Sequence, residues 1–216
     1  MFIPRHPVVE NQFCSYGAQT GTGSAGVGGV VCYAGSVLYL DSDSTNQEPI
    51  VFRYDTFAAK PTAASELKPF GFAMQKVKTG YHQVHPAGFM MPGDLGSSDV
   101  LAQPTYDATG AVTGTKEAPL GVAHLGIWDT VHYVCEHSAN VVSSPNHMKP
   151  GDDLYVACNN QAKVTNHSSI ASDDTKNYEA MVNVIVARVM KGASAAKCSA
   201  NIANTTLYPI RIKLLV

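Results

Sequence analysis

The amino-acid sequence predicts a mainly β protein: an antiparallel β-sandwich or barrel of short strands and hairpins, with long loops and an extended N-terminal arm. Two observations support this prediction. Hydrophobic runs of strand length recur roughly every 8–15 residues, which is typical of sandwiches and barrels. In contrast, no long run has the 3.6-residue period of an amphipathic helix.

One hairpin pattern occurs twice along the chain. A Pro-Gly-Asp turn at residues 150–152 precedes a strand at Leu154–Ala157, and the chain is predicted to return along Ala162–Thr165. Asn159 and Asn160 lie between the two strands, and asparagine tolerates positive φ. The stretch Gly35–Asp41 repeats the opening, with a glycine, a small polar residue and an aliphatic-Tyr-aliphatic strand. The repetition predicts a fold built from a reused hairpin.

Composition limits the possible functions. The chain has 216 residues, of which 15% are charged, with a net charge of −2. A domain of this length can bury roughly 70% of its unfolded surface, so it needs neither a disulfide nor a metal to fold. The sparse, balanced charge argues against nucleic-acid binding, which requires a basic surface. No run approaches the ~20 apolar residues of a membrane span, and the N-terminus lacks the apolar core of a signal peptide.

The cysteines are odd in number and widely spaced, without a C-x-x-C pair. We therefore expect reduced, mostly buried thiols and synthesis in a reducing cytoplasm. The five are Cys14, Cys32, Cys135, Cys158 and Cys198.

The first part of the chain is predicted to be extended. Residues 1–29 are expected to form an arm followed by a glycine-rich loop, because Pro4 and Pro7 disfavour helix in the residues before them. The arm either docks onto a partner or packs on its own domain. Gly21–Gly26 spells G-x-G-x-x-G, but no helix can follow it, so we interpret it as a loop. Residues 30–216 form the β domain, as one unit or as two subdomains divided near residues 86–98.

Several strands follow in the first half of the β domain. Gly35–Asp41 and Ile50–Tyr54 are predicted strands joined by a polar loop, and residues 56–66 are expected to contain at most a short helical turn. Phe70–Thr79 is predicted to be a strand with a basic edge. Val100–Tyr106 leads into a hairpin tip at residues 107–114, with glycine in the left-handed conformation.

The second half continues with apolar runs. Leu120–Val134 is a predicted β stretch that contains the single tryptophan. Met181–Met190 is apolar on nearly all sides and rich in valine, which favours a central strand buried on both faces over a buried helix starting near Lys176. Residues 192–204 are expected to form a loop. Ile210 to Val216 alternates apolar and basic residues, as in a half-buried strand.

No residue pattern indicates catalysis, a cofactor or a metal. His132 and Cys135 fall on opposite faces of a strand, and Cys135 and His137 alone are too few ligands for structural zinc. The carboxylate pairs at Asp152-Asp153 and Asp173-Asp174 lie in turns, where aspartate bonds its own backbone. A glycosidase pair of distant carboxylates stays open. We expect a non-enzyme without cofactors.

Five stretches resemble the head decoration, or cement, proteins of tailed bacteriophages, in which a Gly-Asp-x-Val-Tyr hairpin, a short strand and an Ile-Gly-x-Ala/Val strand recur. The resemblance extends over about half of the chain, but Ile185-Val186-Ala187 lacks the family's glycine and the chain is longer than many cement proteins. The stretches are Gly35–Leu40, Phe70–Ala73, Pro150–Val156, Lys163–Asn166 and Val186–Ala193.

This resemblance implies a virion protein on the capsid exterior that binds the major capsid protein, as a homo-oligomer with a trimer favoured, and without nucleic acid or membrane. We expect the arm to lie across a neighbour, so deleting residues 1–13 should leave a folded protein that no longer binds heads. The expected contact residues are Phe2, Ile3, Arg5, Val8, Val9 and Phe13. The alternatives are a head-fibre base, a tail or baseplate protein, or a virion-borne carbohydrate-active enzyme.

Overall fold

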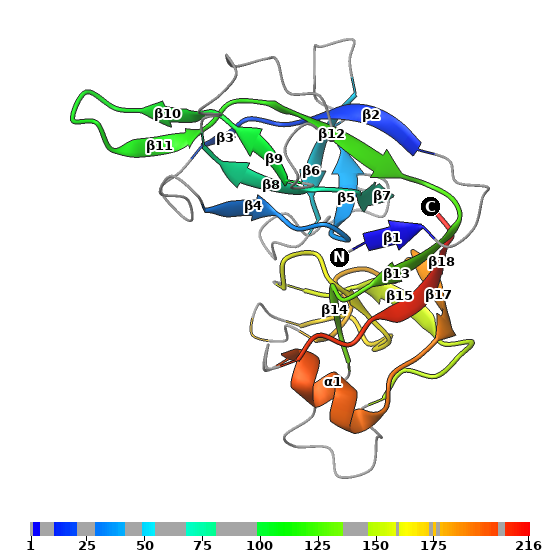
Figure 1. Ribbon diagram of the computed structural model, residues 1–216. Helices are drawn as coiled ribbons and strands as arrows, with labels where there is room; N and C mark the ends of the chain where they lie inside the picture. Colours follow the sequence, from blue (N-terminus) through cyan, green and yellow to red (C-terminus); the bar gives the residue numbers. More distant parts are fainter. Residues whose placement is uncertain are drawn as a thin grey trace.

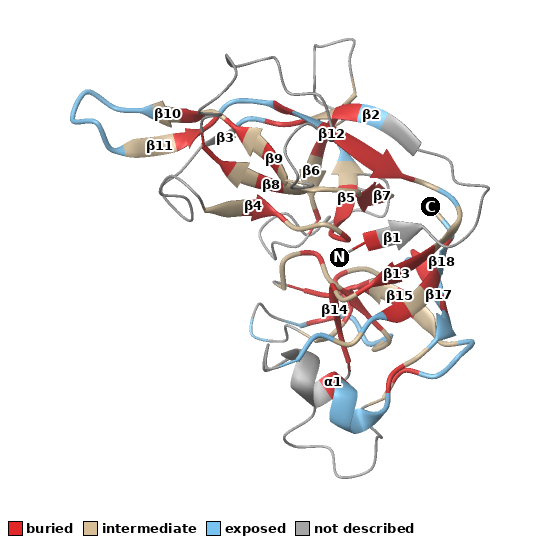
Figure 2. Cartoon of the chain, in the orientation of Figure 1, coloured by how far each residue is buried: buried red, intermediate tan, exposed pale blue. Residues whose placement is uncertain are grey.

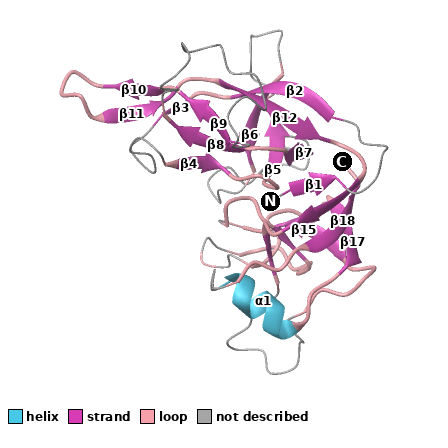
Figure 3. Ribbon diagram, in the orientation of Figure 1, coloured by secondary structure: helices cyan, strands magenta, loops and turns pink. Residues whose placement is uncertain are grey.

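The computed structural model is mainly β, as the sequence predicts (Figure 3). It describes residues 2–4, 11–20, 29–41, 49–54, 68–80, 99–135, 147–158, 160–172, 175, 178–202 and 206–216. The strands are β1 Phe2–Pro4, β2 Asn11–Tyr16, β3 Gln19–Thr20, β4 Val30–Cys32, β5 Val37–Leu40, β6 Ile50–Arg53, β7 Pro69–Ala73, β8 Lys76–Thr79, β9 Asp99–Ala102, β10 Pro104–Tyr106, β11 Val112–Thr115, β12 Ala118–Ala123, β13 Ile127–Thr130, β14 Tyr133–Val134, β15 Asp153–Val156, β16 Val164–Thr165, β17 Ala187–Lys191 and β18 Ile210–Leu214, and the helix is α1 Ala195–Ile202.

The first half of the chain forms a closed five-stranded barrel in the order β12-β2-β6-β5-β7. Four of its pairings are antiparallel, and β2 pairs with β6 in parallel. Alternate residues of each strand point inward, so Tyr16, Leu38 and Leu120 are fully buried. Closure leaves these strands without free edges.

The second half forms a seven-stranded sheet in the order β1-β13-β18-β17-β15-β16-β14. Only Val131 and His132 separate β13 from β14 in the chain. The series of paired strands that starts at β13 and ends at β14 therefore comes back to the segment where it began, which gives the sheet the form of a ring. In this second ring, β14 pairs with β16 in parallel and the other neighbours pair antiparallel. The chain therefore contains two barrel-like bodies, one above the other in Figure 1.

A shared core joins the two bodies (Figure 2). Phe2 of β1 stacks on Trp128 of β13 at 4.5 Å between ring centroids and on Phe72 of β7 at 5.8 Å. Ala162, from the turn between β15 and β16, accepts a hydrogen bond from the Val37 amide of the first barrel. The N-terminal strand thus fills the space between the barrels and is part of the core.

Insertions extend each body. In the first, β8 pairs with β4 and β9 to form a small sheet, and the β10–β11 hairpin projects from the body (Figure 1). In the second, α1 lies between β17 and β18, and a disulfide between Cys135 and Cys198 ties it to the end of β14. Cys198 is buried, whereas the described helix residues before it are exposed.

Most local predictions are confirmed. Gly151 has φ +96° in the turn that opens β15, and Gly110 has φ +82° at the hairpin tip. The residues of β18 alternate between buried and more exposed as expected. The return hairpin from β15 to β16 also forms, and its described positive-φ residues are Gln161 and Ala162 but not Asn160. Asn159 lies outside the described residues.

Four predictions need correction. Met181–Met190 is not one strand buried on both faces: β17 begins at Ala187 and exposes Arg188 and Met190, because its outer face is not covered. Residues 192–204 are not only a loop, since α1 begins at Ala195. Two of the five cysteines form a disulfide, whereas Cys14, Cys32 and Cys158 are outside any disulfide and buried, as expected.

The fourth correction concerns chain organisation. Residues 2–4 pair with β13 and do not extend as a free arm, so deleting residues 1–13 would remove core as well as surface. A boundary near residues 86–98 would separate strands that are paired, since β8 pairs with β9 and β12 pairs with β2 and β7. Residues 86–98 themselves, the Gly21–Gly26 motif and residues 56–66 lie outside the described residues.

Candidate interaction surfaces

The expected contact residues do not form one surface. Phe2 is buried in this chain's own core, which corrects its assignment as a contact residue. The backbone of Ile3 pairs with Asp129, and its side chain lies outside the description. Arg5, Val8 and Val9 also lie outside the described residues. Phe13 is the one that the structure places at the surface: it lies on β2 opposite Gly121 of β12 and its side chain is 67% exposed.

A candidate apolar surface lies at the C-terminal end of β18, beside the residues that precede β13 and β17. The backbone amide of Leu214 donates to the Gly126 carbonyl, and that of Leu215 donates to the Val186 carbonyl, both at 3.0 Å. These bonds bring together three chain segments that carry exposed aliphatic side chains, each between 37% and 46% exposed. We call this the C-terminal apolar cluster; its residues are Leu125, Val184, Ile185 and Leu215. Exposed apolar residues gathered in this way are typical of interaction sites.

The β10–β11 hairpin is a second candidate surface because its tip is exposed from Tyr106 to Ala111 and is internally ordered. One Asp107 carboxylate oxygen accepts hydrogen bonds from the Thr109 hydroxyl at 2.6 Å, the Thr109 amide at 2.8 Å and the Ala111 amide at 3.0 Å. These bonds hold the Asp107 pKa below its usual value, with the Thr109 hydroxyl as the main cause. The tip is therefore preformed and anionic.

The outer edge of this hairpin is poorly suited to pairing with another strand. The Gln103 carbonyl accepts a hydrogen bond from the Lys116 amide, on the side of β11. Because successive residues of a strand form hydrogen bonds to opposite sides, the backbone of the next residue, Pro104, faces the open edge of β10. Proline has no N–H to donate. Thr105 and Thr113 add a side-chain hydrogen bond across the hairpin at 3.2 Å. Contacts through the tip are thus favoured over strand addition.

An open pocket of about 560 Å³ precedes α1 in the second body. The backbones of Gly192 and Met148 lie directly against each other in the pocket wall, because a side chain at Gly192 would collide with the Met148 carbonyl. Met148 and Ala193 form a two-way backbone bridge beneath it, with N–O distances of 3.0 and 3.1 Å. The lining residues are His147, Met148, Lys149, Pro150, Gly192, Ala193, Ser194 and Ala195.

The junction between the bodies contains a buried Ser-His pair, whose hydrogen bonds have a structural role. His132 Nε2 lies 2.9 Å from the Gln161 carbonyl oxygen and 3.1 Å from Ser36 Oγ. A carbonyl can only accept, so Nε2 carries the proton and cannot take one from Ser36. The Ser36 hydroxyl itself donates to the Gln161 carbonyl at 2.8 Å. This serine is therefore not activated as a nucleophile.

Burial also keeps this histidine neutral. Desolvation lowers the His132 pKa to about 3, and the positive charges of Lys163 and Arg53 act in the same direction. The Gln161 carbonyl opposes them because it accepts from the protonated ring. Burial also lowers the pKa of Lys163. His132 thus fixes the turn at Gln161 against the first barrel, and the sequence interpretation as a structural histidine agrees with this arrangement.

Outside the junction, several of the described charges form ion pairs. On the outer face of the second sheet Arg211 contacts Asp129 at 2.9 Å and Arg188 contacts Asp153 at 2.8 Å. Within the described residues, no group of three or more His, Cys, Asp or Glu side chains is placed to bind a metal ion. His137 and the pair Asp173-Asp174 lie outside them. The described helix is neither long nor apolar enough to span a membrane.

Comparison of the chain with models of protein families, with curated proteins and with solved structures finds no match.

Sequence reasoning located the hairpin tip but did not identify it as a surface of interest. Its signal was the run Asp107-Ala108-Thr109-Gly110, which predicts an ordered turn. The pocket and the C-terminal apolar cluster had no sequence signal, because residues far apart in the chain form them.

Proposed function

We propose that this chain is a non-enzymatic virion structural protein that binds the outside of a tailed-phage capsid and cements neighbouring major capsid subunits. The observation that carries the proposal is the C-terminal apolar cluster on a β-built body. The backbone bonds of Leu214 to Gly126 and of Leu215 to Val186 bring together the chain segments that carry its four aliphatic side chains. A preformed apolar surface loses little conformational entropy on binding. The resemblance of the hairpin and strand motifs to head decoration proteins supports the same function.

The mechanism is mass action. A protein that binds the assembled lattice and not the separated subunits stabilises the lattice by RT ln(1 + [L]/Kd), which is about 2.7 kcal/mol per site at a hundredfold excess over Kd. Specific contacts of this kind bury roughly 1,200–2,000 Å². The apolar cluster supplies the centre of such a contact. Phe13 adds a second exposed apolar side chain, on β2, which pairs with β12, the strand that leads toward Leu125.

The test uses mature heads that lack the protein. Purified protein is added, free protein is removed by sedimentation, and the particles are imaged and heated. We expect density on the head exterior and a higher temperature of genome release. Density confined to the tail or to a fibre, or no binding at all, would refute the proposal. Turnover of host glycans, lost on replacing one carboxylate, would refute the non-enzymatic part.

A matched pair of variants tests the apolar cluster. Leu215→Asp places a charge in the cluster, whereas Leu207→Asp makes the same change at a residue that is 53% exposed beyond the opposite end of β18. Both are expected to fold, since both positions are exposed. We expect Leu215→Asp to weaken head binding at least about tenfold, while Leu207→Asp binds as the wild type. Equal binding by all three proteins would exclude the cluster as the contact.

A further inference from the structure

We propose that the β10–β11 hairpin of one copy of this protein docks in the pocket before α1 of a second copy, which forms a head-to-tail contact. The partner is thus the chain itself, and the contact needs no capsid. The proposal rests on three observations: the two bodies are copies of one design, among the described residues only the first fills the slot in question, and the hairpin tip complements the pocket in charge and in the small size of its side chains.

The two opening turns are equivalent in detail. Gly35 and Gly151 have φ +93° and +96°. In both turns a polar side chain after the glycine accepts from a backbone amide three residues before it: Ser36 Oγ from Tyr33 at 3.3 Å, and Asp152 Oδ2 from Lys149 at 2.8 Å. The Gly35 amide donates to the Ala73 carbonyl of β7, and the Gly151 amide donates to the Val189 carbonyl of β17, both at 2.8 Å. β7 and β17 are therefore the corresponding strands of the two rings.

The rings match in register as well. Tyr39 pairs with Phe52 and Leu40 with Val51 in the first ring, as Tyr155 pairs with Thr165 and Val156 with Val164 in the second. The parallel pair Tyr16–Val51 corresponds to Tyr133–Val164. The spacing in the chain between Gly35 and Gly151 also separates Cys32 from Met148 and Val77 from Ala193. The chain is therefore an internal duplication of one five-stranded unit.

This correspondence shows what differs between the copies. Cys32 pairs with Val77 within the β4–β8 ladder, to which β9 adds as a further strand. The equivalent pair, Met148 and Ala193, is an isolated bridge. The pocket lies against that bridge, at the place where the first unit has its own small sheet. Among the described residues no further strand covers this place in the second unit, so a segment of another copy has room there.

The hairpin tip has the properties of such an occupant. Its residues after Asp107 are small and uncharged, Ala108-Thr109-Gly110-Ala111, and the pocket lining is mainly apolar. Asp107 supplies a negative charge whose pKa is lowered, and Lys149 at the pocket rim supplies a positive one. The preformed tip also reduces the entropy lost on docking.

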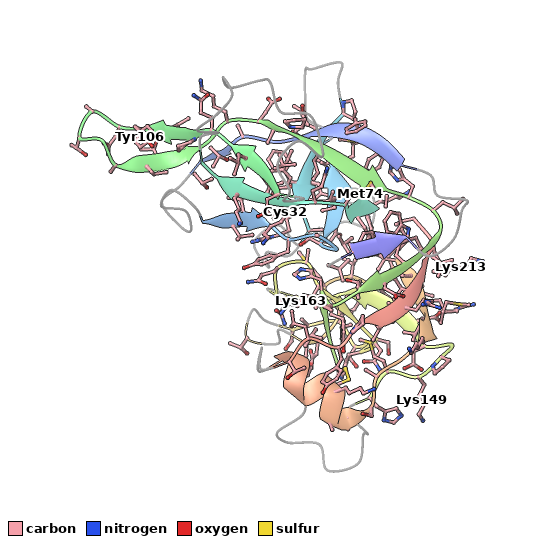
Figure 4. All side chains as sticks on the ribbon, in the orientation of Figure 1. Cys32, Met74, Tyr106, Lys149, Lys163 and Lys213 are labelled. Carbon is pink, nitrogen blue, oxygen red and sulfur yellow. A yellow bond between two sulfur atoms is a disulfide. The ribbon has the colours of Figure 1, made fainter. Side chains whose placement is uncertain are left out.

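The contact must be intermolecular. Tyr106, at the hairpin, and Lys149, at the pocket, lie at opposite ends of the molecule (Figure 4). A contact between two different surfaces of identical chains is heterologous, and it produces a closed ring when the rotation between copies closes and a filament otherwise. A ring of three would be the trimer that the sequence resemblance implies.

The experiment measures the oligomeric state of the purified full chain, without heads, by sedimentation equilibrium at several concentrations. The variants are Ala108→Lys at the tip, Lys149→Glu at the pocket, and the two combined. Lys213→Glu is the matched control, because it makes the same charge change on an exposed residue of β18 outside the pocket. A further variant replaces residues 107–111 by Asn-Gly, which removes the tip and keeps a tight turn. Circular dichroism and thermal unfolding check each fold.

We expect the wild type and Lys213→Glu to associate equally. Each single charge change should raise the concentration for half-association about tenfold, the double variant should recover most of that loss, and the shortened hairpin should be monomeric. A wild type that is monomeric throughout, or an oligomer that survives both the shortened hairpin and Lys149→Glu, would overturn the proposal. Because no capsid is present, these outcomes are independent of whether the protein binds heads.

Discussion

Acidification should weaken this fold through one buried histidine. His132 is buried at the junction of the two bodies and has a pKa of about 3 in the folded protein, against about 6.5 for an unperturbed histidine. Its folded pKa is depressed, so the unfolded chain binds the proton more readily. The stability that neutral His132 contributes is therefore complete above pH 6.5 and is lost as the pH falls from 6.5 towards 3.

The size of the effect follows from the two pKa values. Each pH unit within that window changes the free energy of unfolding by about 1.4 kcal/mol. Between pH 7.5 and pH 5 this amounts to about 2 kcal/mol from His132 alone. With an m-value of about 2 kcal/mol/M, the urea midpoint should move by about 1 M.

The assay is urea unfolding at pH 7.5 and pH 5, for the wild type and for His132→Gln. Glutamine keeps a donor for the Gln161 carbonyl but does not titrate in this range. Seven other histidines and all carboxylates are common to both proteins, so the difference between their pH dependences isolates His132. The wild type should lose about 2 kcal/mol more than the variant. An equal loss in the two proteins, or an NMR titration of His132 near pH 6.5, would refute the reasoning.

Three further predictions follow. Reduction of Cys135–Cys198, which closes a loop with a sequence separation of 63, should lower the free energy of unfolding by about 4 kcal/mol in urea titrations with and without reductant; five titratable thiols before reduction would contradict the disulfide. Phe2→Ala should cost about 3 kcal/mol because it removes the ring that stacks on Trp128, and an unchanged unfolding midpoint would instead support a free arm. Asp107→Ala should speed hydrogen exchange at the Thr109 and Ala111 amides and leave the core unaffected, and unchanged exchange would show that the tip is ordered by other means.

Local features were readable from the chain because their causes are local. Gly151 and Gly110 lie where a turn requires positive φ, and both adopt it. The alternation from Ile210 to Leu214 predicts one buried face, which β18 has. The repeated turn and strand at Gly35 and Gly151 indicated a reused unit, and in both turns the polar side chain after the glycine accepts from the backbone amide three residues before it. In each case the relevant neighbours lie within a few residues.

The features that sequence reasoning missed depend on distant partners. Phe2 could be an arm residue or a core residue, and only its position between Phe72 and Trp128 decides which. Cys135 and Cys198 become bonded because α1 lies beside β14, and nothing in their spacing identifies the pair. The apolar run 181–190 suggested burial on both faces, yet no layer covers Arg188 and Met190 on the outer side of β17.

The sequence by itself determined the β class, the turns at Gly110 and Gly151, the two copies of the hairpin and which face of β18 is apolar. Only the tertiary structure decided that the strands close into two rings, that the N-terminus is a core strand, and where the pocket and the C-terminal apolar cluster lie. The reason is physical: turn chemistry and side-chain alternation act over a few residues, whereas ring closure and surface shape depend on pairings between segments far apart in the chain. Bringing such segments together costs loop-closure entropy, which only the whole set of tertiary contacts offsets.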